Sequence, residues 1–98
     1  MEVTLKKDGS SLVAAVEGRI NTATAPQFEE KIVPALDGVT DLVIDMSGLS
    51  YISSAGLRVV LTTQKVMSKQ GSMRLRGLRP EVLEVFEMTG FADFLDIE

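Results

Sequence analysis

Alternation of apolar and polar side chains opens the chain and predicts two strands. In residues 2–7, Val3, Leu5 and Lys7 alternate with Thr4 and Lys6, and residues 11–17 form a second, mostly apolar run. The segment between them, Asp8-Gly9-Ser10, is a tight-turn signal. Strand, Asp-Gly and strand together are typical of an antiparallel β-hairpin. We expect Gly18 to end the second strand.

A period of about four residues then predicts a first helix. Residues 24–27 have the composition of a helix start, with Thr24 placed to cap, Gln27 to reach back and Pro26 in the first turn. An apolar stripe follows, made by Phe28, Ile32 and Leu36. Pro34 lies within this stripe, where its ring clashes with the carbonyl four residues earlier. We therefore expect a kink or an irregular last turn at that position.

The remainder of the chain alternates between strand and helix patterns. Residues 41–46 form a short aliphatic run typical of a strand, and residues 56–70 carry apolar side chains at helical spacing. Residues 72–76 alternate between apolar and basic, which predicts a further strand. Residues 80–89 predict a third helix, and residues 94–98 a short edge strand. A glycine follows each predicted helix, where a left-handed residue would close it: Gly38, Gly71 and Gly90.

The order ββαβαβα plus a short C-terminal strand predicts an α/β fold in one domain spanning residues 1–98. The strand at 41–46, the helix after it and the strand at 72–76 form a crossover unit, so these two strands should be parallel. The leading hairpin is antiparallel. We therefore expect a mixed sheet of four to five strands, with the three helices mainly on one face.

Composition removes most enzyme chemistry. The chain has 98 residues and neither cysteine nor histidine, so it offers no disulfide, no thiolate metal site and no imidazole for acid–base work. We expect a protein that is not an enzyme and that uses no cofactor and no metal. No segment approaches ~20 apolar residues and the N-terminus lacks a signal pattern, which predicts a cytoplasmic protein without membrane insertion. The net charge of −4 disfavours nucleic-acid binding.

The charges are distributed in two blocks. From Arg58 to Arg79 the chain has six basic residues and no acidic one, and from Glu81 onward six acidic residues and no basic one. Such blocks can steer a charged partner. The charge pattern alone favours a simpler interpretation, two solvated faces.

The double serine Ser53-Ser54, between the predicted third strand and second helix, is the main candidate for chemistry. Capping of the helix by one serine is the simplest interpretation and is favoured by spacing alone. A nucleophilic serine is disfavoured, because no histidine exists and Lys65 lies about three helical turns away. A phosphate-binding turn bracketed by Gly48 and Gly56 lacks the glycine motifs of nucleotide sites.

Regulatory phosphorylation is the fourth interpretation of the double serine. A phosphate adds roughly −1.5 to −2 charge, which suits the positive end of a helix dipole. The domain would tolerate it, whereas a partner surface packed on the same serine would not. Phosphorylation there would switch binding without altering the fold.

Four segments of the chain resemble one family over nearly its whole length: Gly18–Pro26, Leu42–Ser47, Tyr51–Leu57 and Phe86–Phe91. They are similar to the bacterial anti-sigma-factor antagonists, which are single STAS domains (sulphate transporter and anti-sigma antagonist). The resemblance implies a STAS-type fold and a protein that, when unphosphorylated, binds an anti-sigma-factor serine kinase and frees the sigma factor. It also implies that the kinase phosphorylates a serine at the start of the second helix and that a phosphatase of the PP2C type restores binding.

The resemblance assigns the phosphorylated serine to Ser54, aligned by Gly56 and Leu57. Three residues depart from the family pattern. Ser53 and Asn21 stand where many members have an aspartate, and Ala55 stands where the family often has serine or threonine. Loss of the acid beside Ser54 would alter kinase recognition or leave Ser53 as a competing acceptor. The implied partner-binding residues are Asn21, Thr22, Ser53, Ser54, Gly56 and Arg58.

Two other functions are compatible with a stand-alone STAS domain. One is an accessory subunit of a membrane transport complex, and the other is a nucleotide-binding module. The sequence indicates a monomer or a weak dimer without deciding between them.

Overall fold

A β-hairpin followed by parallel strands builds the sheet of the computed structural model, which describes residues 1–98. The hairpin strands are β1 (Glu2–Asp8) and β2 (Ser11–Ile20), and their pairing is antiparallel. The parallel strands β3 (Asp41–Ile52), β4 (Ser72–Arg76) and β5 (Asp96–Ile97) complete a five-stranded sheet in chain order. The predicted mixed sheet, the crossover unit and the C-terminal edge strand are therefore confirmed.

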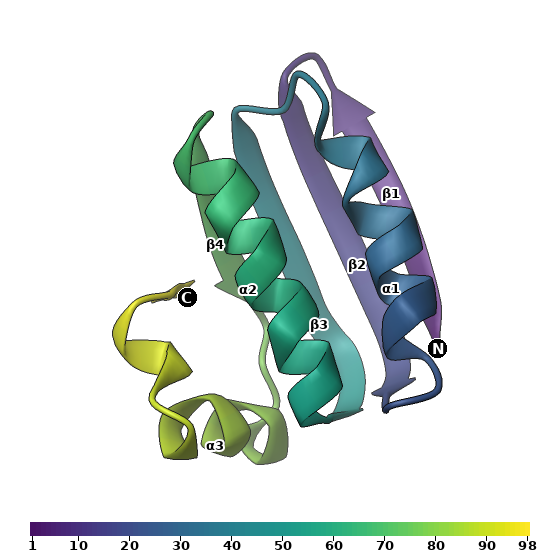
Figure 1. Ribbon diagram of the computed structural model, residues 1–98, viewed down its shortest axis with the longest axis vertical. Helices are drawn as coiled ribbons and strands as arrows, with labels where there is room; N and C mark the ends of the chain where they lie inside the picture. Colours follow the sequence, from purple (N-terminus) through teal and green to yellow (C-terminus); the bar gives the residue numbers. More distant parts are fainter.

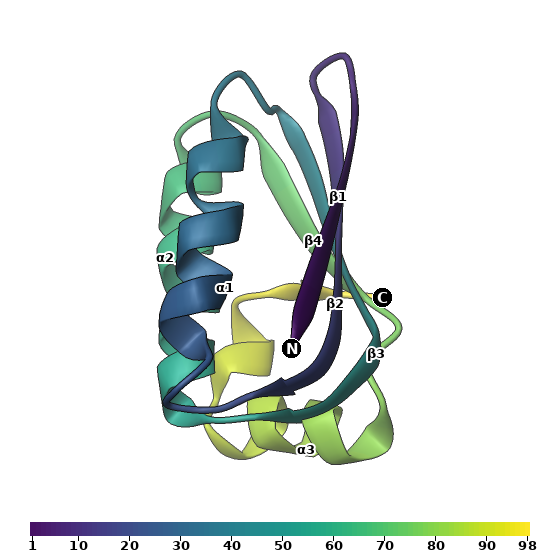
Figure 2. The same ribbon diagram turned by 90° about the vertical axis from the view of Figure 1, so that its right-hand side faces the viewer.

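The helices are arranged in one layer and at one end of the sheet. The helices α1 (Ala25–Ile32) and α2 (Ser54–Ser68) lie side by side over one face. The helix α3 (Pro80–Met88) lies across the end at which β2 and β3 finish (Figures 1 and 2). No helix covers the opposite face. None of the three helices combines the length and the apolar content of a membrane-spanning segment.

The core lies between the helical layer and the sheet. The stripe residues Phe28, Ile32 and Leu36 are at most 2% exposed, as the period of four predicts. Alternate residues of β2 and β3 meet them, and all are buried: Leu12, Ala14, Val16, Leu42, Ile44 and Met46. The expected irregularity at Pro34 is also present, because α1 ends at Ile32 and a short 3₁₀ helix, Pro34–Leu36, follows.

Both central strands continue beyond the predicted ends. Gly18 does not end β2, which runs to Ile20 with Gly18 at a φ of +92°. Residues 47–50, expected to lie outside a strand, belong to β3. Between the partner pairs Ala15–Asp45 and Glu17–Gly48, β2 advances two residues and β3 three, so a bulge has inserted a residue into β3. A second register shift follows Gly18. Together the two shifts interrupt the alternation of apolar and polar side chains by which a strand is predicted from sequence.

The predicted capping box of α1 is not formed. Thr24 is the N-cap, but its side chain caps nothing, because its oxygen accepts a hydrogen bond from the backbone N–H of Asn21 and donates to the carbonyl of Arg19. The second helix begins at Ser54 rather than Gly56 and ends at Ser68. The third ends at Met88, one residue before the predicted end.

Two of the three glycines after the helices adopt the expected left-handed conformation. Gly38 and Gly90 have φ values of 76° and 80°. Gly71 does not have a positive φ. Position 71 requires glycine for a different reason: a Cβ atom there would collide with the backbone of Thr40.

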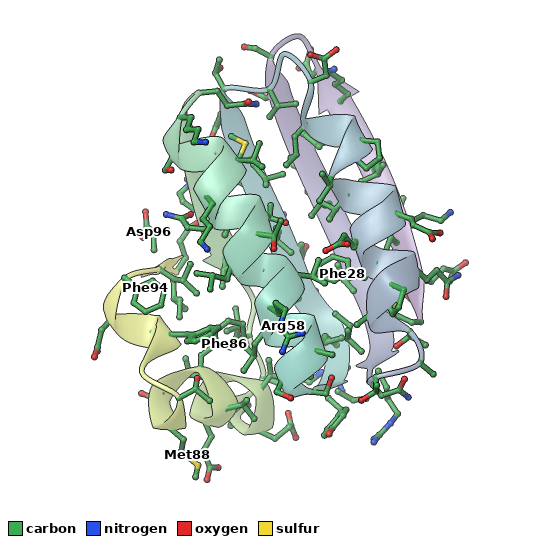
Figure 3. All side chains as sticks on the ribbon, in the orientation of Figure 1. Phe28, Arg58, Phe86, Met88, Phe94 and Asp96 are labelled. Atoms are coloured by element: carbon green, nitrogen blue, oxygen red, sulfur yellow. The ribbon has the colours of Figure 1, made fainter.

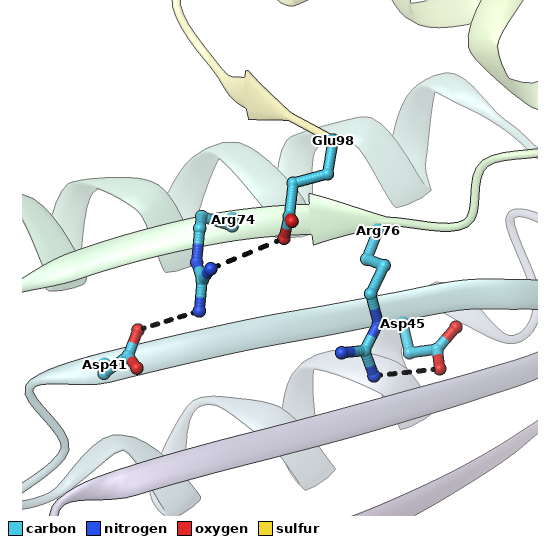
Figure 4. A network of polar contacts seen from close by, with 5 residues as sticks. All are labelled: Asp41, Asp45, Arg74, Arg76 and Glu98. Carbon is cyan, nitrogen blue, oxygen red and sulfur yellow. Dashed lines mark hydrogen bonds and ion pairs between the residues drawn. The ribbon is translucent and has the colours of Figure 1, made fainter.

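The sheet face without helices carries ion pairs. Arg74 lies 3.6 Å from carboxylate oxygens of both Asp41 and Glu98, and Arg76 lies 3.2 Å from Asp45 (Figure 4). Two members of the basic block are therefore neutralised across the strands. Surface pairs of this kind contribute little to stability, about 0–1 kcal/mol each.

Candidate functional site

The carboxyl ends of β2 and β3 meet at the start of α2. Ile20 and Ile52 are register partners, and the backbone N–H of Ser53 donates to the carbonyl of Ile20 at 2.8 Å. The loop after β2, which contains Asn21 and Thr22, is thereby held beside the double serine. The two turns therefore meet at one end of the sheet.

Ser53 is the N-cap of α2. Its backbone is extended, and its side-chain oxygen accepts a hydrogen bond from the backbone N–H of Gly56 at 3.3 Å. This contact satisfies one of the free donors at the helix start. The capping interpretation of the double serine is therefore confirmed for Ser53. An aspartate at this position would accept the same hydrogen bond, so the departure from the family pattern preserves the cap.

Ser54 is the first residue of α2 and is exposed. Its side chain makes no hydrogen bond, in contrast to that of Ser53. The first turn of the helix contains no acidic residue, so no neighbouring carboxylate on that turn would repel an anion there. The Ser54 hydroxyl is free to react or to contact a partner.

Asn21 organises the adjacent loop. Its side-chain oxygen accepts hydrogen bonds from the backbone N–H groups of Ala23 at 2.9 Å and Thr24 at 3.0 Å. An aspartate, the residue that many family members have at this position, would accept the same two hydrogen bonds, since both are made to a side-chain oxygen. Thr22 lies at the turn of this loop and is exposed, so it belongs to the surface around the serines.

Gly56 occupies a position with no room for a side chain. It is buried, and a Cβ atom there would lie 2.7 Å from side-chain carbons of both Ile20 and Ile52. Because it is buried, Gly56 has no surface to offer a partner. Its contribution to the site is to let the first turn of α2 pack against the ends of β2 and β3.

Arg58 lies one turn after Ser54 and is exposed on the outer side of α2 (Figure 3). No carboxylate lies within ion-pair distance of its guanidinium, since the three ion pairs of the molecule involve Arg74 and Arg76 only. An unpaired cation beside an exposed serine is available to an external group.

The sequence interpretation missed one pair of residues at this end of the sheet. Arg19 and Tyr51 are register partners at the ends of β2 and β3, and the guanidinium carbon of Arg19 lies 4.4 Å from the centre of the Tyr51 ring. Tyr51 is 38% exposed. Both residues stand within segments that carry the family resemblance. Their pairing was not predictable, because the aliphatic pattern of the sequence ends the strand at residue 46, before Tyr51.

The site has the form of an exposed surface rather than an enclosed cavity. The single surface hollow of the molecule is lined by Met1, Glu2, Glu17 and Gly18 and includes neither serine. No buried polar side-chain atom lacks a hydrogen-bond partner. The arrangement of an exposed hydroxyl, an exposed cation and an ordered loop suits contact with a macromolecule.

Comparison with known proteins places the whole chain in one group. The family model described as STAS domain matches residues 2–98. The chain is 40% identical over 99 residues to BtrV of Bordetella bronchiseptica, covering 99% of this chain and 85% of that protein. It is 34% identical over 98 residues to the anti-sigma-B factor antagonist of Bacillus subtilis, covering 99% and 90%.

Solved structures share the fold. An anti-sigma factor antagonist from Mycobacterium paratuberculosis superposes with a TM-score of 0.89 at 24% identity, covering 98% of this chain and 83% of that chain. The Bacillus cell fate determinant SpoIIAA in its phosphorylated form superposes with a TM-score of 0.75 at 21% identity, covering 99% and 91%. At these identities the likeness concerns the arrangement of strands and helices.

Proposed function

Because this chain belongs to the STAS domain family, we propose that it is an anti-sigma-factor antagonist switched by phosphorylation of Ser54. In the unphosphorylated state it binds an anti-sigma-factor serine kinase and releases the sigma factor. The observation that carries the proposal is the exposed, unengaged hydroxyl of Ser54 at the first position of α2. The protein acts as one STAS domain in the cytoplasm and catalyses no reaction itself.

The relatives support this function. The Bacillus subtilis protein, 34% identical along almost the whole chain, is named an anti-sigma-B factor antagonist. SpoIIAA, which has the same fold, is known in a phosphorylated form. An anti-sigma factor antagonist with the same fold as this chain is therefore known to carry a phosphate.

The two serines have different roles in the proposal. The oxygen of Ser53 is engaged in the helix cap, and its side chain is partly covered. The side chain of Ser54 is exposed and has no intramolecular hydrogen bond. A kinase therefore meets Ser54 without disturbing the helix, which favours Ser54 over Ser53 as the acceptor.

The switch acts on the contact and leaves the fold intact. The partner-binding surface comprises Asn21, Thr22, Ser53, Ser54 and Arg58, with Gly56 as the packing residue beneath it. A phosphate on Ser54 adds roughly two negative charges at a helix N-terminus, where the helix dipole stabilises them. The same group lies on the surface that the partner contacts, so it prevents binding. Removal of the phosphate by a PP2C-type phosphatase restores binding.

The test uses each kinase-type anti-sigma factor of the source organism with ATP, followed by mass-spectrometric mapping of the phosphate. We expect modification of Ser54 in the wild type and in Ser53→Ala, and none in Ser54→Ala. Binding to the same kinase, measured by calorimetry, should persist in Ser54→Ala and be lost in Ser54→Asp. If no kinase modifies Ser54 and Ser54→Asp binds as tightly as the wild type, the proposal is wrong.

A further inference from the structure

The outer face of α2, together with its C-cap residue Lys69, carries a row of unpaired cations. Arg58, Lys65 and Lys69 are separated by seven and four residues, which places them within about 40° of one another around a helix of 3.6 residues per turn. All three are exposed, and no acidic side chain forms an ion pair with any of them. Ser54 stands at the head of the same row, four residues before Arg58.

This row differs from the rest of the basic block. Arg74 and Arg76 face the open side of the sheet, where they pair with carboxylates. Arg79 donates to the backbone carbonyl of Ser47 at 3.0 Å. These three arginines have partners within the molecule, so the solvated-face interpretation of the sequence does not describe them. The three cations of the row have no such partner and face solvent.

Helix stability gives no reason for the row. The sequence of α2 contains no aspartate or glutamate, so it forgoes the acid–base pairs that stabilise exposed helices by about 0.2–0.5 kcal/mol each. Lys65 and Lys69 are like charges at a spacing of four, which costs a similar amount. The helix dipole favours these two lysines near the C-terminal end, but Arg58 lies one turn from the opposite end and gains nothing from it.

The surroundings of the row have the opposite charge. On the neighbouring helices exposed acids outnumber exposed bases: α1 has Glu29 and Glu30 against Lys31, and α3 has Glu81, Glu84 and Glu87. The protein as a whole has a net charge of −4. A positive stripe about 16 Å long on an acidic protein selects for a partner with a complementary negative stripe.

We propose that Arg58, Lys65 and Lys69 form a docking stripe for an acidic face of the anti-sigma factor, so that phosphorylation of Ser54 repels this partner by charge. The inference rests on the proposed function and deepens it. A phosphate on Ser54 lies about 6 Å along the helix from Arg58, within a Debye length of it. It offsets the cation at the head of the stripe and places negative charge against the acidic partner.

A protein partner fits the stripe better than a membrane or a nucleic acid. Three cations on a protein of net charge −4 release few counterions from a polyanion. Stable membrane anchoring by charge takes a longer polybasic segment or a lipid chain. Binding to phosphatidylglycerol vesicles or to duplex DNA, lost in the triple variant described below, would overturn the assignment to a protein partner.

The test measures association of the full chain with the anti-sigma factor at several salt concentrations. In Arg58→Glu/Lys65→Glu/Lys69→Glu we expect the association rate at low salt to fall by about tenfold or more. Lys6→Glu, on the sheet face away from the helices, alters the net charge as much as the single variant Lys65→Glu does and is the matched control for that variant. It should change the rate by less than about twofold, and by less than Lys65→Glu does. The variant Arg58→Gln/Lys65→Gln/Lys69→Gln should have an association rate between those of the wild type and the glutamate triple variant. Thermal melting confirms that each variant folds.

The outcomes separate this inference from the proposed function. Unchanged rates in the glutamate triple variant, with binding still lost in Ser54→Asp, would overturn the docking stripe and leave the switch in place. Absence of wild-type binding to any anti-sigma factor would overturn both. The salt series adds a second criterion: repulsion predicts that the wild-type and Ser54→Asp affinities converge as salt rises, whereas a purely steric block leaves their ratio constant.

Discussion

The side-chain oxygen of Ser53 accepts a hydrogen bond from the backbone N–H of Gly56 at 3.3 Å. This one contact divides the double serine into two roles, because it engages the first serine and leaves the second free. It also explains why α2 begins at Ser54, two residues earlier than the apolar pattern predicts. The start of the helix, the cap and the exposed hydroxyl are thus fixed together.

Ser53→Ala should destabilise the protein by about 1 kcal/mol, because the cap is lost while the helix start remains exposed to water. Ser53→Asp retains an acceptor at the same position and should stay within a few tenths of a kcal/mol of the wild type. Urea unfolding followed by circular dichroism measures both. Ser54→Ala is the matched control and should have little effect. Equal stabilities for Ser53→Ala and the wild type would show that the cap contributes nothing.

Gly56→Ala should lower the free energy of unfolding by roughly 1–3 kcal/mol, since its Cβ atom would enter space held by Ile20 and Ile52. The direction of this change in stability is informative, because alanine in a helix interior ordinarily stabilises a protein by about 0.5–1 kcal/mol relative to glycine. The double variant Ile20→Ala/Gly56→Ala removes the blocking methyl group of Ile20. Its loss should be smaller than the sum of the two single losses. Additive losses would contradict the packing explanation.

The order of the elements and their pairing were predictable because the core residues follow simple periods. Phe28, Ile32 and Leu36 recur every four residues, and all three face the sheet. The strand Ser72–Arg76 has the bounds that its alternation predicts. In these segments the burial pattern and the local period agree, so the sequence alone was sufficient.

The site itself was less predictable, because its geometry depends on irregular backbone. The extension of β3 to Ile52 needs two register shifts against β2, and each shift moves the following side chains to the other face. The alternation of apolar and polar residues in the sequence does not reveal where such a residue is inserted. The contact between Arg19 and Tyr51 and the burial of Gly56 both follow from this extension, so they appear only in the folded chain.

Long-range packing accounts for the other differences. Gly71 has the position of a helix-closing glycine, yet its role is to let the chain pass close to the backbone of Thr40, thirty-one residues earlier. The double serine was a different case. Spacing suggested a cap but did not say which serine provides it, and only the observed hydrogen bond assigns that role to Ser53.

Asp45 should make stability depend on acid pH. Hydrogen bonds from Ser47, with a smaller contribution from Arg76, hold the pKa of the Asp45 carboxyl below its ordinary value. A carboxyl whose pKa is lower in the folded state stabilises the fold above its unfolded pKa of about 3.9, and this contribution is lost as the pH falls through the folded pKa. Asp45→Asn should therefore cost about 1 kcal/mol at neutral pH and progressively less below about pH 4.

Urea unfolding at a series of pH values measures this dependence. Asp8→Asn, at an exposed end of β1 with no ion pair, controls for the loss of one negative charge. Its effect on the free energy of unfolding should be small throughout. A difference between Asp45→Asn and the wild type that persists unchanged at the lowest pH would show that the carboxylate charge is not responsible.

A negative group at position 54 should leave the fold as stable as before or slightly more so. Ser54 is the first residue of α2, where the helix dipole favours negative charge by about 0.3–1 kcal/mol at low salt. Arg58 follows at the spacing at which an acid and a base attract along a helix, for about 0.2–0.5 kcal/mol more. Ser54→Asp and the phosphorylated protein should therefore melt at or above the wild-type temperature, and Ser54→Lys below it.

Differential scanning calorimetry at low and high salt measures this effect, and the gain should shrink as salt rises. The same samples are then compared for binding to the anti-sigma factor. A protein that keeps its melting temperature yet no longer binds has been switched at its surface. If Ser54→Asp instead melted several degrees lower, the loss of binding would result from damage to the fold. The proposal that Ser54 is a switch acting only at the surface would then be wrong.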